Sequence, residues 1–148
     1  MTILCQLDEL KLSCFGCCGN SYSNKKKLMQ DIKKNTLEFN NKKNITQFMT
    51  RTHHLKESGI CANLIFKDKK FFCPGHPALH SRRDYRNLDP DCHKDHICKT
   101  YGLFQIWTQE KKLKFLNFLK SKKFDSYTYS IKMDDNSMLE DFEKEMKK

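Results

Sequence analysis

The sequence predicts a small α+β domain that is mainly helical, contains a short β-hairpin and is organised around a cysteine-rich metal centre. Apolar residues recur at helical spacing in several segments, one segment has the pattern of a hairpin, and eight cysteines occur in clusters. A chain of 148 residues fits one domain of ordinary size. We therefore expect a single domain over 1–148, with a cysteine-rich core at about 5–98 and a helical, acidic C-terminal part at about 99–148.

The first helix is expected after the cysteine-rich start of the chain. Residues 1–20 contain four cysteines and two glycines, a pattern that favours a loop wrapped around a ligand. Ser23 or Asn24 could cap the helix that follows. Its apolar face would consist of Leu28, Ile32 and Leu37. A further helical turn or two is expected around residues 45–49.

Residues 59–73 have the pattern of a β-hairpin. Apolar residues at 60–66 are followed by a polar turn at 67–70 and by Phe71 and Phe72. Cys61 and Cys73 lie at the outer ends of the two arms. Antiparallel pairing would bring these two thiols near each other, because residues at the open end of a hairpin are neighbours across the ladder.

The second half of the chain predicts helices and one strand. Asp89 or Asp91 could cap a helix that begins at Cys92. Thr108 could cap a second helix, and residues 137–148 predict a short terminal helix. The alternation of apolar residues at 127–133 predicts an edge strand. The expected apolar positions of the helices that begin at Cys92 and after Thr108 are Ile97, Tyr101, Phe104, Trp107, Leu113, Leu116 and Leu119.

The cysteines are the candidate metal ligands. Cys14-x2-Cys17 has the spacing of a metal knuckle, a turn in which two sulfurs face one ion while backbone N–H groups point at them. The adjacent side chains of Cys17 and Cys18 diverge in most backbone conformations. They would therefore serve two metals, a cluster, or one metal and one core position. The eight candidates are Cys5, Cys14, Cys17, Cys18, Cys61, Cys73, Cys92 and Cys98.

Histidines near these cysteines are further candidates. Cys92 and His96 are four residues apart and would share one face of the expected helix. Any single cysteine could instead be a small buried apolar residue, although eight in three clusters argue against this for the whole set. Four thiols suffice for one zinc ion or one [4Fe–4S] cluster, and eight allow a second site or spare thiols. The other histidine candidates are His76, His80 and His93.

The order and spacing of these residues resemble the YkgJ-type cysteine-cluster family, which carries a C-x2-C-x2-C-C motif. That family is described as zinc- or iron-chelating domains and includes the cysteine-rich part of flagellin lysine methylases. The resemblance covers about Cys14 to Cys98 and implies a buried zinc, iron or iron–sulfur centre. It departs at Lys11, where the first cysteine of the motif would fall, so that Cys5 takes its place or the site is one ligand short. The matching residues are Cys14-x2-Cys17-Cys18-Gly19, Gly59-x-Cys61-x2-Leu64 and Cys73.

The charge balance leaves nucleic acid open as a partner. The formal net charge is +10, but lysines far outnumber the four arginines, and arginine is the residue that reads bases and phosphates with a bidentate fork. A solvated basic surface is the simpler interpretation. The alternative is a zinc-stabilised nucleic-acid-binding protein whose Phe71, Phe72 and Tyr101 stack on bases, although their spacing fits a core better.

The remaining predictions concern catalysis and location. The sequence has no Gly-rich nucleotide loop, G-x-S-x-G elbow or H-E-x-x-H helix. A metal-dependent modification enzyme would have to use the metal itself, with Tyr85, His76 or His93 moving protons. Whether the protein is an enzyme stays open, as does a protein partner.

No membrane association is expected, because no apolar stretch approaches bilayer length. Asp8 and Glu9 stand where a signal peptide would be apolar. We therefore expect a cytoplasmic protein, where reduced cysteines favour metal ligation over the alternative of a disulfide-linked protein.

Overall fold

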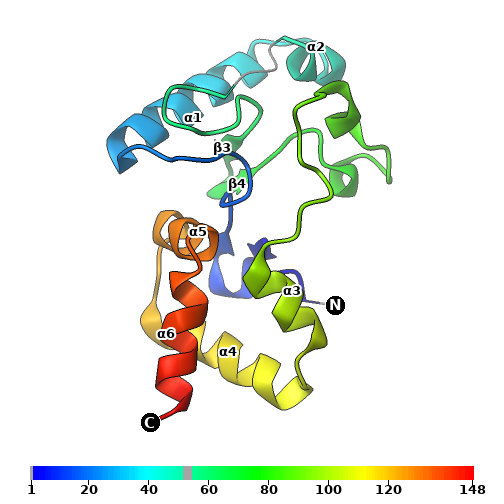
Figure 1. The fold of residues 1–148 in the computed structure, drawn as a ribbon. Helices are drawn as coiled ribbons and strands as arrows, with labels where there is room; N and C mark the ends of the chain where they lie inside the picture. Colours follow the sequence, from blue (N-terminus) through cyan, green and yellow to red (C-terminus); the bar gives the residue numbers. More distant parts are fainter. Residues whose placement is uncertain (1, 52–54) are drawn as a thin grey trace. The chain divides into compact units, whose positions relative to one another are not determined.

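The computed structural model describes residues 2–51 and 55–148, and it divides the chain into two compact units. The terminal unit comprises Met1–Cys17 and His96–Lys148, and the central unit comprises Cys18–Asp95. Within the described residues there are six α-helices and two short antiparallel hairpins, drawn in Figure 1. This confirms the expected α+β fold class, mainly helical with a short hairpin. The organisation as one domain stays a prediction.

The terminal unit consists of four helices and a short hairpin near the N-terminus. The expected loop at this start is replaced in part by two-residue strands that pair with each other, with Leu7 opposite Leu12. A 3₁₀ turn with two adjacent acids at its start connects them. Its elements are β1 (Gln6–Leu7), η1 (Asp8–Leu10), β2 (Leu12–Ser13), α3 (Lys99–Ile106), α4 (Gln109–Lys122), α5 (Ser126–Asp134) and α6 (Ser137–Met146).

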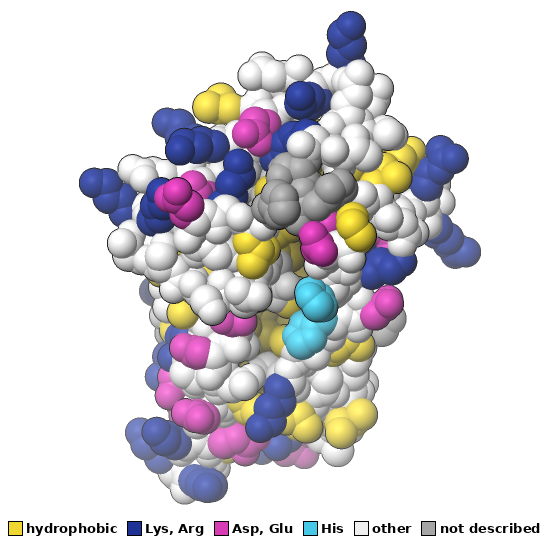
Figure 2. Space-filling model, turned by 45° about the horizontal axis from the view of Figure 1, so that its top comes forward, with side chains coloured by type: hydrophobic (Ala, Val, Ile, Leu, Met, Phe, Trp, Pro, Cys, Tyr) yellow, Lys and Arg dark blue, Asp and Glu magenta, His cyan; other side chains and the backbone are white. Residues whose placement is uncertain are grey.

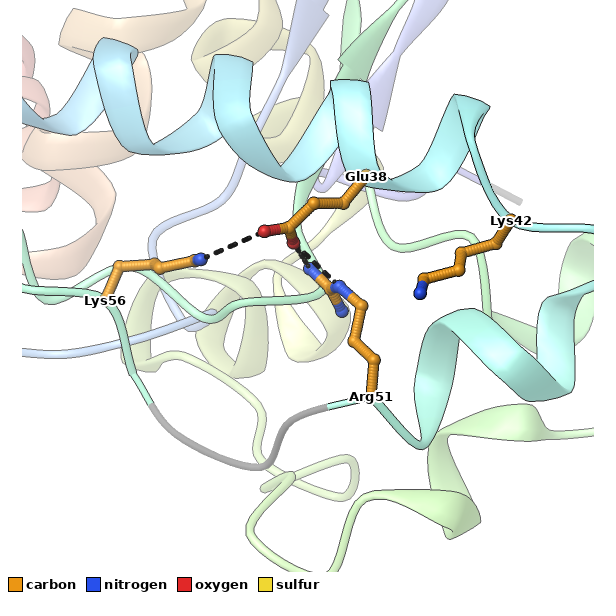
Figure 3. Close-up of a pocket in the computed structure, with 4 residues that line it drawn as sticks. All are labelled: Glu38, Lys42, Arg51 and Lys56. Atoms are coloured by element: carbon orange, nitrogen blue, oxygen red, sulfur yellow. Dashed lines mark hydrogen bonds and ion pairs between the residues drawn. The ribbon is translucent and has the colours of Figure 1, made fainter.

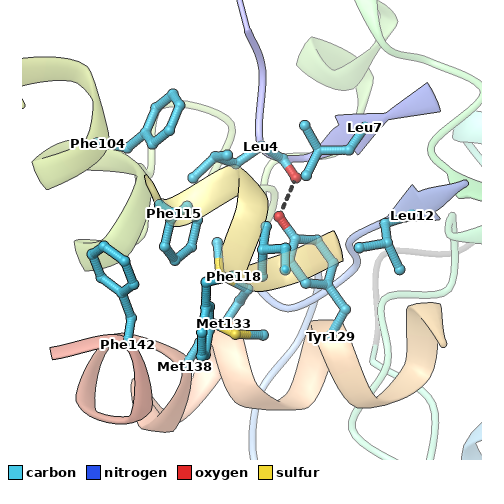
Figure 4. Close-up of a cluster of buried hydrophobic side chains, with 11 residues drawn as sticks. Leu4, Leu7, Leu12, Phe104, Phe115, Phe118, Tyr129, Met133, Met138 and Phe142 are labelled. Carbon is cyan, nitrogen blue, oxygen red and sulfur yellow. Dashed lines mark hydrogen bonds between the residues drawn. The ribbon is translucent and has the colours of Figure 1, made fainter. Parts of the chain in front are cut away.

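An aromatic core joins the helices of the terminal unit to its N-terminal segment (Figure 4). Phe115 of α4 lies 5.1 Å from Phe142 of α6 and 5.9 Å from Phe104 of α3, measured between ring centroids. The buried Tyr129 hydroxyl of α5 donates a hydrogen bond of 2.7 Å to the Leu4 carbonyl. Burial of rings at these separations stabilises the unit beyond the area removed from water.

The expected edge strand at 127–133 is wrong, because this segment is helix α5. Asp125 caps the helix by accepting a 2.7 Å hydrogen bond from the Thr128 N–H. Tyr129 and Met133, four residues apart, are both buried. Alternating apolar residues in so short a segment fit either structure, and here packing at helical spacing decides.

The expected helix start at Cys92 is also wrong. Residues 92–97 are irregular apart from a turn at 94–95, and α3 begins at Lys99 with Cys98 as its N-cap. Between Cys92 and Cys98 the only apolar residue is Ile97, which is exposed. This stretch therefore has no apolar face to bury, and a helix that buries nothing is marginal in water. The helix expected after Thr108 is present as α4.

The central unit packs a long helix against the predicted hairpin. Asn24 caps α1, as expected, and Leu28 and Ile32 are buried while Leu37 is exposed. The expected short helix is present as α2. The strands are shorter than predicted, since residues 60 and 61 form isolated bridges instead. The elements are α1 (Lys25–Asn40), α2 (Ile45–Met49), β3 (Ile65–Lys67), β4 (Lys70–Phe72), η2 (Pro77–Leu79) and η3 (Tyr85–Leu88).

The hairpin turn has the backbone that its two-residue length requires. Asp68 and Lys69 both have positive φ, at 53° and 65°, which is the conformation that matches the twist of two directly connected strands. Ile65 pairs with Phe72, and Cys73 follows the last residue of β4. Over the described residues, no helix combines the length and apolar character needed to cross a membrane.

Candidate metal centre

No disulfide joins any of the eight cysteines, and none of them is fully buried. Seven are half-buried and Cys17 is exposed. Packing as small apolar residues therefore does not account for them, because buried free cysteine is typically fully enclosed. Four of the eight belong to each compact unit. The terminal set is Cys5, Cys14, Cys17 and Cys98, and the central set is Cys18, Cys61, Cys73 and Cys92.

The terminal set gathers where β2 leads into the predicted knuckle. The Cys14 N–H donates a 2.9 Å hydrogen bond to the Cys5 carbonyl, which places these two residues side by side. Cys14 and Cys98 both pack against the aromatic core described above. Residues far apart in the sequence, such as Cys14 and Cys98, thus contact the same core.

The terminal thiols act on one another electrostatically. Burial, followed by the neighbouring thiols of Cys17 and Cys98, raises the pKa of Cys5 to about 12. Burial raises the pKa of Cys14, and the Gly16 N–H partly opposes that shift. The pKa of Cys98 is raised by burial, opposed by the Tyr101 N–H. Since such influence falls away with distance, the set is spatially grouped, and without a cation its buried thiols are protonated at neutral pH.

The Cys14–Cys17 turn has the feature that a metal knuckle predicts. The Gly16 N–H donates to Cys14 Sγ at 3.3 Å, within the turn itself. Helix α5 supports the same turn, since the Ser130 hydroxyl accepts from the Phe15 N–H at 3.0 Å. Gly16 has no room for a side chain, because a Cβ there would lie 2.8 Å from the Ser130 carbonyl oxygen.

The central set is assembled by two close approaches of the backbone. The Cys61 N–H donates a 2.7 Å hydrogen bond to the Cys18 carbonyl. Next to it, Gly19 lies so close to Gly59 that a Cβ on Gly19 would be 2.1 Å from the Gly59 carbonyl oxygen. Asn35 of α1 then holds the Cys61 carbonyl through its side-chain amide at 3.1 Å.

Cys73 and Cys92 complete the central set. Burial raises the pKa of Cys73 to about 12. The Gly75 N–H opposes this rise, and the thiols of Cys61 and Cys92 add smaller contributions to it. Burial and then Cys61 raise the pKa of Cys92 to about 11. The two residues Cys61 and Cys73 are not neighbours across one ladder as predicted, because the β3–β4 pairing ends at Ile65 and Phe72 and Cys61 bridges Leu55 instead. The Cys61 sulfur also accepts a hydrogen bond, at 3.4 Å, from the Asn63 N–H.

A chain of polar side chains fixes the segment around Cys61. The amide of Asn63 donates to the buried Asp89 carboxylate at 3.0 Å and accepts from Arg51 Nη1 at 2.9 Å. The Asp89 carbonyl in turn accepts from the Cys92 N–H at 3.2 Å. This polar network therefore connects the surroundings of two central thiols, and no motif in the sequence predicts it.

The outer end of that network lines a surface pocket (Figure 3). Glu38 of α1 accepts from Arg51 Nε at 2.7 Å and pairs with Lys56 at 3.6 Å. Lys42 completes the lining. Arg51 is thus held by a carboxylate, and the ring of Phe48 lies 3.9 Å below its guanidinium. These contacts of Arg51 with Glu38 and Phe48 anchor the polar network.

No histidine candidate is brought into either set by a contact in the structure. His76 is exposed, and its Nδ1 accepts a hydrogen bond from the Ala78 N–H. His80 bonds the Pro74 carbonyl through Nε2, at 2.6 Å. His93 and His96 are exposed in the irregular segment before α3. The expected pairing of Cys92 with His96 on one helix face is wrong, because no helix forms there.

The thiols of neither set converge on a ready metal-binding point. Within the described ranges, no three His, Cys, Asp or Glu side chains form a ready metal-binding group. The chemistry of the donors nevertheless suits thiophilic ions, since thiolates select zinc, iron and iron–sulfur clusters. The division of the chain into two units assigns four thiols to each, and backbone N–H groups donate hydrogen bonds to the sulfurs of Cys14, Cys61 and Cys98.

The surface gives the nucleic-acid alternative little support. Figure 2 shows Lys and Arg side chains spread over the visible face with Asp and Glu among them. Phe71 is 5% exposed, and Tyr101 packs against the aromatic core of the terminal unit. These two rings are thus engaged in packing rather than presented for stacking on bases.

Comparisons of the chain with models of protein families, with curated proteins and with solved structures found no match. The resemblance to the cysteine-cluster family therefore rests on the motif and its spacing alone, and it stays a prediction.

Proposed function

We propose that the protein binds zinc or iron through clustered cysteine thiolates, with iron present either as single ions or in an iron–sulfur cluster. The observation that carries the proposal is the set of backbone N–H groups directed at cysteine sulfurs. Cys14, Cys61 and Cys98 each accept such a bond, at 3.3 to 3.4 Å. These bonds favour the thiolate over the thiol, and the thiolate is the form that binds metal.

The expected role of the metal is to hold irregular segments together. Apart from Cys98, which caps α3, the cysteines lie in irregular segments and next to very short strands, where few backbone hydrogen bonds fix the chain. A metal bound by thiolates contributes directly to the free energy of folding in small domains. Zinc would supply this stabilisation alone, whereas iron would add redox chemistry.

We also propose a reducing compartment, the cytoplasm, for this protein. A reducing compartment keeps cysteines out of disulfides, so that this many of them stay available as metal ligands.

The test is the metal and acid-labile sulfide content of protein purified without oxygen and without a metal-binding tag. We expect stoichiometric zinc, or iron with or without sulfide. Cys17→Ser should lower that content and the free energy of unfolding together. Cys17 is the exposed cysteine, so the substitution disturbs packing least. Asn117→Ala, at an exposed position of α4, is the matched control and should retain full metal. Metal-free wild-type protein with eight reactive thiols would overturn the proposal.

A further inference from the structure

The course of the chain separates two adjacent cysteines. It leaves the terminal unit between Cys17 and Cys18 and returns between Asp95 and His96. At the first boundary, Cys17 belongs to the terminal set and Cys18 to the central set. At the second boundary, Cys92 precedes it in the central set and Cys98 follows it in the terminal set. Each unit therefore contains four of the eight thiols.

Contacts within each unit support this division. Within the terminal set, a backbone hydrogen bond joins Cys14 to Cys5, and Cys14 and Cys98 pack on one core. The central set is tied together by the Cys61–Cys18 backbone hydrogen bond of 2.7 Å. Asp89 links the surroundings of Cys61 and Cys92 through the polar network. Each set thus has its own scaffold.

Four thiolates are the full ligand complement of a tetrahedral structural zinc site or of one iron–sulfur cluster. We infer that the chain holds two separate metal centres, one on Cys5, Cys14, Cys17 and Cys98 and the other on Cys18, Cys61, Cys73 and Cys92. The inference rests on the proposed function and adds to it the number of centres and the ligands of each. Cys17 and Cys18, although neighbours, serve different centres.

The matched variants Cys17→Ser and Cys18→Ser test this assignment, because they alter adjacent positions. Native mass spectrometry counts the centres per chain, and brief alkylation with iodoacetamide, mapped by peptide mass, shows which thiols lose protection. We expect two centres in the wild type and one in each variant. Cys17→Ser should expose Cys5, Cys14 and Cys98 to alkylation, whereas Cys18→Ser should expose the other three central thiols.

Two results would overturn the inference while leaving the proposed function intact: a single centre in the wild type, or the same thiols exposed in both variants. A wild type without metal would instead overturn the proposed function itself. If the variants fail to fold, titration of the reduced wild-type protein with Co²⁺ decides. Two ions per chain, each with thiolate charge-transfer absorption, support the inference, and saturation at one ion contradicts it.

Discussion

Asn63 is the side chain on which the surroundings of Cys61 depend most. It is 2% exposed, and its amide group joins Arg51 to Asp89 while its N–H faces the Cys61 sulfur. An amide can donate and accept at once, so it satisfies a guanidinium on one side and a carboxylate on the other. This dual role explains why an asparagine occupies a buried position next to a candidate ligand.

We predict that Asn63→Ala lowers the free energy of unfolding by about 1–3 kcal/mol, the cost of leaving a buried polar partner unsatisfied. The buried Asp89 carboxylate would lose the donor to its Oδ2 atom, while the Asp91 N–H would still donate to Oδ1. Urea denaturation at neutral pH measures the change. Asn117→Ala, exposed on α4, should shift the free energy by no more than about 0.5 kcal/mol. Equal effects of the two substitutions would contradict the role assigned to Asn63.

The candidate ligands could be predicted from the sequence because cysteine is rare and its spacing is informative. Their supporting residues could not. Ser130 bonds the knuckle from 115 positions away, and Asp89 bonds Asn63 from 26 positions away. A serine or an asparagine is common, and only the tertiary fold reveals what it contacts.

At the scale of elements, helix α3 shares a residue with the candidate metal centre. Cys98 is its N-cap, and its sulfur accepts from the Tyr101 N–H at 3.4 Å. Serine is among the best N-cap residues, whereas alanine cannot accept such a bond. Two substitutions at this position can therefore separate capping from ligation.

We predict that Cys98→Ser and Cys98→Ala both reduce bound metal but differ in the stability of the metal-free protein. After removal of metal with a chelator, the alanine variant should be less stable than the serine variant by about 1 kcal/mol, the usual contribution of an N-cap. Thermal unfolding followed by circular dichroism measures both. Retention of the full metal content in either variant would exclude Cys98 as a ligand.

The packing of α5 against the knuckle gives a second prediction at this scale. Gly16→Ala should destabilise the protein by about 1–3 kcal/mol, because the new Cβ meets the Ser130 carbonyl at 2.8 Å and backbone must shift. The control is Gly102→Ala within α3, where the nearest atom is Ile97 Cγ2 at 4.0 Å. That change should stabilise the helix by about 0.5–1 kcal/mol. Denaturation midpoints that move in the same direction would contradict this account.

Two helices in which a cap is followed by apolar residues at helical spacing were predicted correctly. α1 has a capping asparagine followed by apolar residues at helical spacing, and α4 has a capping threonine. The errors fall on short segments. In α5 apolar residues alternate with polar ones, which is a pattern typical of a strand. The contacts that decide the structure, such as the hydrogen bond of Tyr129 to Leu4, are long-range.

At the scale of the whole molecule, the raised thiol pKa values couple metal binding to protons. The pKa values of Cys5 and Cys73 are about 12 and that of Cys92 is about 11, chiefly because of burial. These thiols are therefore protonated at pH 7 before metal binds. Binding must release about one proton per coordinating thiol, and affinity must fall as the pH is lowered.

This release can be measured by isothermal titration calorimetry with Zn²⁺ in two buffers of different ionisation enthalpy. The difference in observed heat gives the number of protons released. We expect several protons per ion, and weaker binding at pH 6 than at pH 8. Heats that are identical in the two buffers would show that the thiols were already ionised and would contradict the pKa shifts.

The discontinuity of the terminal unit has a consequence for the entropy of folding. Its two parts are separated by the whole of residues 18–95, so folding must close a loop of that length, and the cost of closure grows with the logarithm of length. An ion bound by both Cys17 and Cys98 would cross-link the two ends of this intervening chain. Loss of that ion should therefore disorder the terminal unit through the freedom it returns to the intervening chain, in addition to the loss of the bonds themselves.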